Sequence, residues 1–149
     1  MDFRQRFSRS ILTLLAVLAV ACTPLIAGYS LEAYRYATSL KAETLAIMAK
    51  ADEPFAQHAA EVSALRIRMA AAQEFAAGMP LNQLSARQWR IMNDPDGGLA
   101  GEYWVVWEQQ GTISTAARTA QIQQVSHAFD EIICLEANKE KNTRCVPGS

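Results

Sequence analysis

An apolar seam through residues 54–79 constrains the fold of this chain more than any other feature. Apolar and weakly polar residues recur there at alternating spacings of three and four, the heptad pattern of a packed helix. The seam consists of Phe55, His58, Val62, Leu65, Met69, Ala72, Ala76 and Met79. Polar residues fill the other faces, so the segment predicts one long amphipathic helix that buries the seam against neighbouring helices. A self-pairing coiled coil is the alternative.

Three more segments have helical periodicity, which favours packing within one chain. Residues 30–51 combine an alanine-rich face with Ser30 as a suitable N-cap. Residues 85–93 predict a short helix, and residues 115–138 predict a long one with an apolar stripe. That stripe consists of Ile122, Val125, Phe129, Ile132 and Ile133. Because the link between the first two helices is short, we expect them to form an antiparallel hairpin.

The segment 99–110, LAGEYWVVWEQQ, fits both a strand and a helix. Its centre, Tyr103 to Trp107, has high strand propensity, but Leu99, Tyr103, Val106 and Trp107 also share one helix face. A strand needs partners, and the sequence offers no convincing second strand, so we expect a helix. The predicted fold class is therefore all-α, a compact bundle of four to five helices over residues 30–138, followed by a polar C-terminal tail over residues 139–149.

Four large aromatic residues, Trp89, Tyr103, Trp104 and Trp107, lie close together in the sequence. One helix can bury both Trp104 and Trp107 only if its apolar face is very wide, so we expect one of them to be partly exposed. Exposed aromatic side chains are typical of binding hot spots, and the group is our candidate partner-binding surface. The alternative is that the rings fill the core of an alanine-rich bundle.

The N-terminus has the layout of an export signal. Three arginines precede an apolar run from Ile11 to Ala21, which is too short to span a bilayer. The run ends in Leu18-Ala19-Val20-Ala21-Cys22, which resembles the lipobox of bacterial lipoproteins. The resemblance implies that residues 1–21 are a cleaved signal peptide and that the thiol of Cys22 is acylated, for example with palmitate. Residues 22–29 would then tether the body to the membrane.

The same resemblance implies a subcellular location. Thr23, rather than aspartate, follows the cysteine, and in bacterial lipoproteins this favours passage to the outer membrane, with the body in the periplasm. One alternative is a secreted periplasmic protein cut at the same bond. Another is an uncleaved anchor from Ile11 to Ile26, but Pro24 argues against a continuous helix there.

Charge and cysteine content agree with such a compartment. Removal of residues 1–21 leaves 11 basic and 14 acidic side chains, a formal charge of −3, which gives no reason to expect nucleic acid as a partner. With Cys22 acylated, Cys134 and Cys145 are an even pair, and we expect a disulfide between them that fixes the C-terminus. Two unpaired thiols are the alternative.

Residues that could carry chemistry are few. His58-x-x-Glu61 and His127-x-x-Asp130 each place an imidazole and a carboxylate one helical turn apart, which is a weak metal signal. The sequence contains no nucleophile elbow, phosphate-binding glycine loop or zinc helix motif. We therefore expect no enzyme, no catalytic residue, no metal and no cofactor.

Two classes of function remain. The first is a non-enzymatic envelope lipoprotein that docks an envelope protein as an accessory factor; a prophage or plasmid exclusion lipoprotein is a special case. The second is a small-ligand or metal-binding bundle, which predicts an internal cavity of ~300 Å³ or more, lined by His58, Met69 and Phe129.

Overall fold

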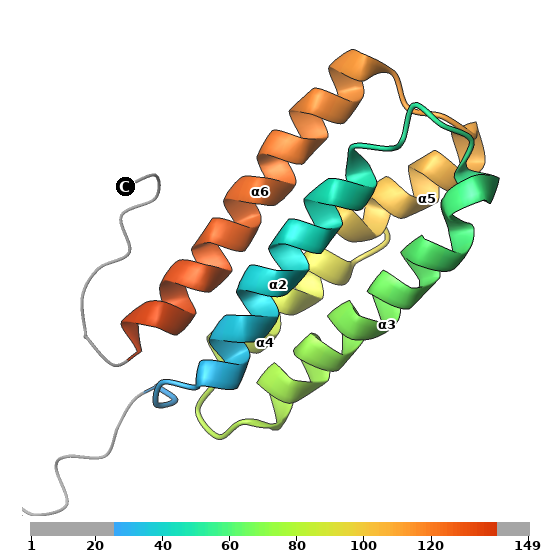
Figure 1. Ribbon diagram of the computed structural model, residues 1–149. Helices are drawn as coiled ribbons and strands as arrows, with labels where there is room; N and C mark the ends of the chain where they lie inside the picture. The colour runs from blue at the N-terminus through green and yellow to red at the C-terminus, as the bar shows by residue number, and fades with distance from the viewer. Residues whose placement is uncertain (1–25, 140–149) are drawn as a thin grey trace, which may run out of the picture.

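The computed structural model describes residues 26–139, and within that range the chain forms five α-helices and no strand (Figure 1). The helices are α2 (Leu31–Met48), α3 (Phe55–Gly78), α4 (Gln83–Asn93), α5 (Ala100–Gln110) and α6 (Thr115–Asn138). The predicted all-α bundle is confirmed, and residues 100–110 form a helix rather than a strand. Serine side chains cap two of the helices: Ser30 accepts from the backbone N–H of Ala33, as expected, and Ser114 accepts from that of Ala117.

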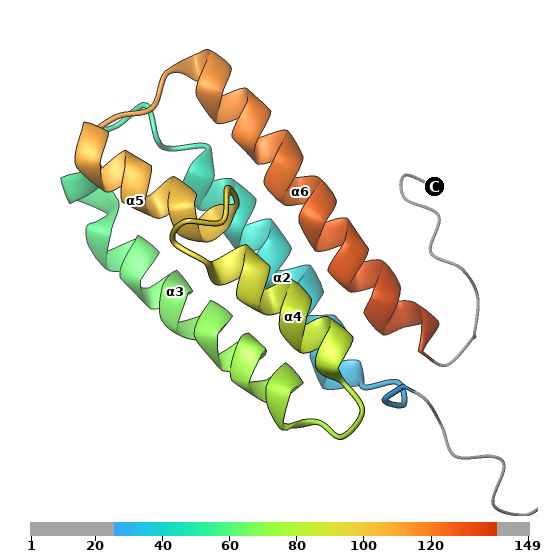
Figure 2. The same ribbon diagram turned by 180° about the vertical axis from the view of Figure 1, so that it is seen from behind.

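The helices form an antiparallel bundle in which α4 and α5 share one position. Helix α2 packs against α3 and α6, and α4 packs against α3, α5 and α6. Helices α4 and α5 have 11 residues each, whereas α3 and α6 have 24, so the two short helices together span the length of one long helix (Figures 1 and 2). The chain thus runs up, down, up and down, with its third leg broken in the middle.

A close backbone approach explains where the third leg breaks. At Gly101, in the first turn of α5, a Cβ atom would collide with the carbonyl oxygens of Asn93 and Asp94 at the end of α4. Only glycine lets α5 begin this close to α4. The turn between the helices includes Gly98 at φ 76°, whose backbone N–H donates to Glu102 Oε2 at 2.5 Å. Residues 94–98, Asp-Pro-Asp-Gly-Gly, are typical turn residues, and this turn redirects the chain within one leg.

Most of the predicted seam lies in the core. Its central residues are at most 2 % exposed: Val62, Leu65, Met69, Ala72 and Ala76. The stripe of α6 faces the same core through Val125, Phe129 and Ile132. At the seam's N-terminal end, Phe55 and His58 are only half-buried, because the seam emerges there at the end of the bundle. The interpretation of residues 54–79 as a bundle helix is thus confirmed.

The two ends of the bundle differ. At one end α2 begins, α3 ends, α4 begins and α6 ends; we call it the N-terminal pole (Figure 1). The other end, the distal pole, holds the α2–α3 and α5–α6 links, which are joined by backbone hydrogen bonds from Phe55 to Gly111 and from Ile113 to Ala51. Among residues 26–139, no helix has the length and apolar character needed to cross a bilayer.

Candidate functional site

The aromatic group belongs to the core rather than to the surface. Trp89, Tyr103, Trp104 and Trp107 are 2 %, 3 %, 1 % and 0 % exposed, so the expectation that Trp104 or Trp107 is partly exposed is wrong. Trp104 and Trp107 are three residues apart, so both rings lie on the same side of α5, and together with Ala100, Gly101 and Tyr103 they form its buried face. The core-filling alternative describes these residues, and they are not available as a docking surface.

Two polar atoms of the aromatic group, on Tyr103 and Trp107, make internal hydrogen bonds, whereas the buried Nε1 of Trp104 has no hydrogen-bond partner. Tyr103 Oη donates to the carbonyl oxygen of Met48 at 3.1 Å, and Trp107 Nε1 donates to that of Glu53 at 3.1 Å. Burial raises the pKa of Tyr103 to about 12, so this hydroxyl remains a neutral donor. These bonds attach α5 to the end of α2 and to the α2–α3 link, which is a structural role.

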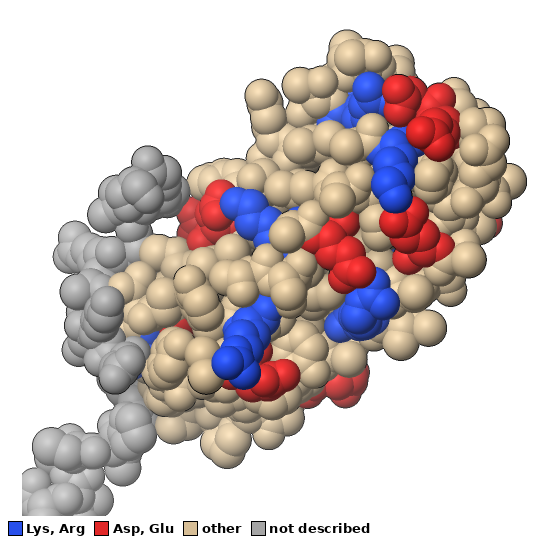
Figure 3. Space-filling model, in the orientation of Figure 1, with Lys and Arg blue, Asp and Glu red and all other residues tan. Residues whose placement is uncertain are grey.

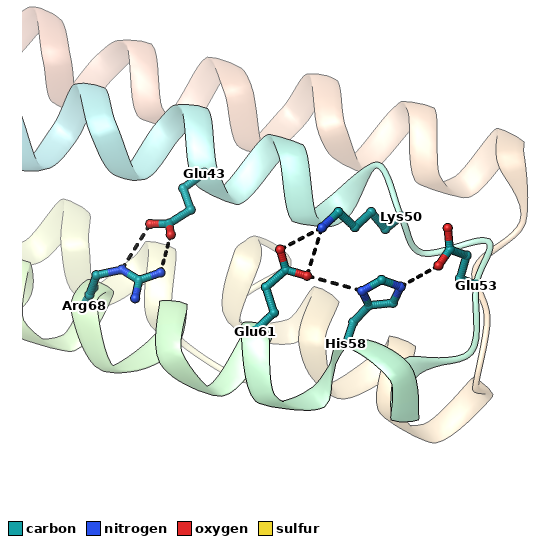
Figure 4. A network of polar contacts seen from close by, with 6 residues as sticks. All are labelled: Glu43, Lys50, Glu53, His58, Glu61 and Arg68. Atoms are coloured by element: carbon teal, nitrogen blue, oxygen red, sulfur yellow. Dashed lines mark hydrogen bonds and ion pairs between the residues drawn. The ribbon is translucent and has the colours of Figure 1, made fainter.

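His58 is the centre of a surface ion-pair network (Figure 4). Its Nε2 lies 2.7 Å from Glu53, and its Nδ1 lies 3.2 Å from Glu61, which also accepts from Lys50. The hydrogen bond to Glu53, assisted by Glu61, raises the pKa of His58, whereas the hydrogen bond from Lys50 lowers the pKa of Glu61. The network joins the α2–α3 link to α3, and Figure 4 shows it beside a pair that joins α2 to α3 directly, Arg68 with Glu43.

No set of three or more metal-ligating side chains comes together within residues 26–139. Both histidines of the weak metal signal contact carboxylates, but His127 lies 3.9 Å from Glu131 rather than next to Asp130. Asp130 pairs instead with Lys41 of α2 at 2.5 Å. The pairs seen in the sequence thus act between helices or along the surface.

Two cavities among the described residues differ from the interior site that a small-ligand binder would need. A cavity of about 200 Å³ lies between α5 and the start of α6, lined among others by Leu99, Val106 and Ala117. A smaller one of about 150 Å³ includes Met69, but neither is lined by His58 or Phe129. Phe129 packs edge-on against Trp89, with ring centroids 5.9 Å apart, so core packing fills the predicted position.

A buried polar cluster at the N-terminal pole was not predicted. Lys139 Nζ donates to Asn82 at 2.5 Å, to Ser85 at 3.0 Å and to Glu136 at 2.6 Å. The side chains of Lys139 and Glu136 are 2 % and 1 % exposed. Glu136 extends the α6 stripe by one heptad step after Phe129 and Ile132, and that spacing was a sequence signal for its burial.

Serine with lysine is a known catalytic combination, but the contacts in this cluster are those of a structural link between helices. All three hydrogen bonds of Lys139 Nζ run from the lysine to its partners, and the hydroxyl oxygen of Ser85 is one of the acceptors. Ser85 is 0 % exposed, which keeps a substrate from reaching its hydroxyl. The cluster joins the end of α6 to the start of α4.

The surface of the same pole carries uncovered apolar side chains. Ile26, Tyr29 and Leu31 precede or begin α2, and Leu81 and Leu84 lie at the α3–α4 link and the start of α4. Their exposed fractions are 44 %, 41 %, 50 %, 44 % and 54 %. The backbone N–H of Ala27 donates to the carbonyl oxygen of Leu81 at 3.0 Å, so the two segments lie side by side. We call these five residues the pole patch.

The pole patch is the strongest candidate for a functional surface. Elsewhere, on the face that Figure 3 shows, basic and acidic side chains are interspersed and neither sign forms a continuous field. The sequence reasoning missed Leu81 and Leu84 because they lie outside the periodic helix faces. Two leucines beside the turn at Pro80, on either side of polar Asn82 and Gln83, were the available signal.

The predicted lipidation site and one predicted disulfide partner lie outside the described residues. Cys22 precedes Ile26 by four residues, and Cys145 follows Lys139 by six. Cys134 is described and lies half-buried on α6. Its bridge to Cys145 stays a prediction.

Comparison of the chain with protein families, with curated proteins and with solved structures finds no match.

Proposed function

We propose that this protein is a bacterial envelope lipoprotein, anchored through acyl chains on Cys22, whose helical body acts by contact with an envelope protein and not by catalysis. The observation that carries the proposal is the lipobox-like sequence ending at Cys22, placed directly before a folded bundle. Thr23 supports the outer membrane as its destination, with the body on the periplasmic side.

The spacing between anchor and body supports a role at a membrane surface. Ile26, the first described residue, follows Cys22 by four positions. Whatever the conformation of the chain between them, four residue-to-residue steps reach at most about 14 Å. An acylated Cys22 would therefore hold the N-terminal pole close to the lipid headgroups and limit the body to partners at that surface.

Uncovered apolar side chains on the flank of the bundle support contact with a protein. Ile67 on α3 is 68 % exposed, and Ile91 on the neighbouring α4 is 47 % exposed. A folded partner can cover isolated side chains of this kind as part of a larger interface. The buried aromatic group makes no contribution to that interface.

Metabolic labelling with a fatty-acid analogue tests the anchor. The wild-type protein should take up the label, and Cys22→Ser should lose it. Cys134→Ser is the matched control, since it removes a cysteine that the lipobox does not include, and it should label like the wild type. Equal labelling of the Cys22→Ser variant would contradict the proposal.

Fractionation of the labelled cells tests which membrane holds the protein. Wild-type protein should migrate with the outer membrane, and Thr23→Asp should shift to the inner membrane, because aspartate at this position is the residue that retains similar lipoproteins there. Protein that is recovered in the soluble periplasmic fraction would favour the secreted alternative.

A further inference from the structure

We infer that the pole patch is a lipid-contacting surface, which seats the N-terminal pole on the membrane and makes the bundle project from it end-on. The inference rests on the proposed anchor for the proximity of the membrane. It adds that lipid covers the pole patch and that the long axis of the bundle points away from the membrane.

The distribution of exposed apolar side chains is uneven. Within residues 26–139, seven large apolar side chains are exposed, and five of them form the pole patch. They come from two segments 50 residues or more apart in the sequence that the Ala27 to Leu81 hydrogen bond holds together. Clustered apolar exposure of this kind marks an interaction site rather than chance.

Leu81 is exposed and also has a backbone conformation that leucine disfavours. Its φ is 60°, in the left-handed region, and it is the only residue other than glycine with a positive φ among those described. Glycine or asparagine would adopt this conformation at lower cost. A leucine that is both strained and 44 % exposed is unfavourable for the bundle alone, and a functional contact of its side chain accounts for it.

The chemistry of the patch suits a bilayer interface. Leucine and isoleucine bury their side chains in the upper acyl region, and tyrosine, with its apolar ring and polar hydroxyl, favours the headgroup level. Arg87 lies one helical turn beyond Leu84 on the same exposed face of α4, where its side chain could reach lipid phosphates. Beneath the patch, Lys139 and Glu136 pair with each other and are hidden from the surface.

The position of the anchor selects lipid over other occupants. The chain from Cys22 to Ile26 is too short to carry the pole more than about 14 Å from the acylated residue. A second copy or a protein partner would have to fit into that same narrow space. With the pole seated, the distal pole would lie about 36 Å away, the length of the 24-residue α3 and α6.

Site-specific photocrosslinking tests the contact on the whole protein as the cell processes it. A benzophenone amino acid replaces Leu84, and the purified protein is reconstituted in vesicles of phosphatidylethanolamine and phosphatidylglycerol that carry a radioactive lipid. Ile67 and Thr112 are the matched control positions: Ile67 is more exposed than Leu84 but lies on the flank of α3, and Thr112 is exposed at the distal pole. Tyr29, which precedes the helices, is a second test position if the Leu84 variant does not fold.

We expect lipid adducts at Leu84 and Tyr29 and no lipid adduct at Ile67 or Thr112. Adducts at Ile67 as well would mean that the bundle lies flat, and would overturn the end-on orientation. Protein adducts or dimers at Leu84, without lipid, would overturn the lipid assignment. If the fatty-acid label depends on Cys22 but Leu84 yields no lipid adduct, this inference fails and the proposed anchor does not.

Discussion

The backbone N–H of Ala27 donates a hydrogen bond of 3.0 Å to the carbonyl oxygen of Leu81, which joins the first described residues of the chain to the link between α3 and α4. This bond fixes the direction in which the chain enters the bundle. Because Ala27 is also 5 % exposed, the entry segment is packed as well as hydrogen-bonded. An anchor on Cys22 would therefore act on a body whose orientation at the pole is defined.

Leu81→Gly should leave the bundle at least as stable as the wild type. A left-handed conformation costs leucine about 1–2 kcal/mol, and the extra freedom of glycine in the unfolded chain offsets roughly half of that gain. We expect the free energy of unfolding to rise by zero to about 1 kcal/mol in urea titrations. Leu84→Gly is the control and should lower it by about 1 kcal/mol, since position 84 is helical. A clear loss at Leu81 would show that its side chain stabilises the bundle itself.

Lys139→Met should destabilise the protein strongly, because it leaves the carboxylate of Glu136 buried without its cation. Loss of one partner from a buried ion pair costs about 3 kcal/mol or more. The double variant Lys139→Met with Glu136→Gln should recover most of that loss, because no charge stays buried. Thermal and urea unfolding of the two single variants and the double variant measure the coupling. Additive losses would contradict a direct interaction.

His58 should make stability depend on pH near neutrality. Its pKa is raised above the ordinary value of 6.5, chiefly by Glu53, so the protonated form is favoured in the folded state. The stabilisation is fully present below pH 6.5 and is lost as the pH rises through the higher pKa of the folded state. Urea unfolding at a series of pH values should show this decline in the wild type and not in His58→Gln. His127→Gln is the control: that side chain is 64 % exposed, and its variant should keep the decline.

Gly101→Ala should be destabilising, although alanine is the better helix former. The added Cβ would overlap the carbonyl oxygens of Asn93 and Asp94, and α5 would have to shift away from α4. We expect a loss of about 1–3 kcal/mol in the free energy of unfolding. Gly78→Ala at the end of α3 meets nothing within 4 Å and should gain up to about 1 kcal/mol. Equal effects of the two substitutions would contradict the close approach of α5 to α4.

The sequence by itself determined the helices. The spacing of Val62, Leu65 and Met69, the caps at Ser30 and Ser114, and the turn residues after Asn93 each act over one or two helical turns, so local periodicity was sufficient to place all five helices to within a few residues. Even the ambiguous segment 99–110 was resolved by the lack of a strand to pair with.

Only the tertiary structure decided which side chains are covered. Trp104 and Trp107 are buried because several helices surround α5, and Lys139 is buried because it reaches Asn82, 57 residues earlier in the chain. The pole patch likewise exists because residues 26–31 and 81–84 meet. Burial and exposure depend on neighbours that are distant in sequence, and a periodic pattern shows which face of a helix is apolar but not what lies against it.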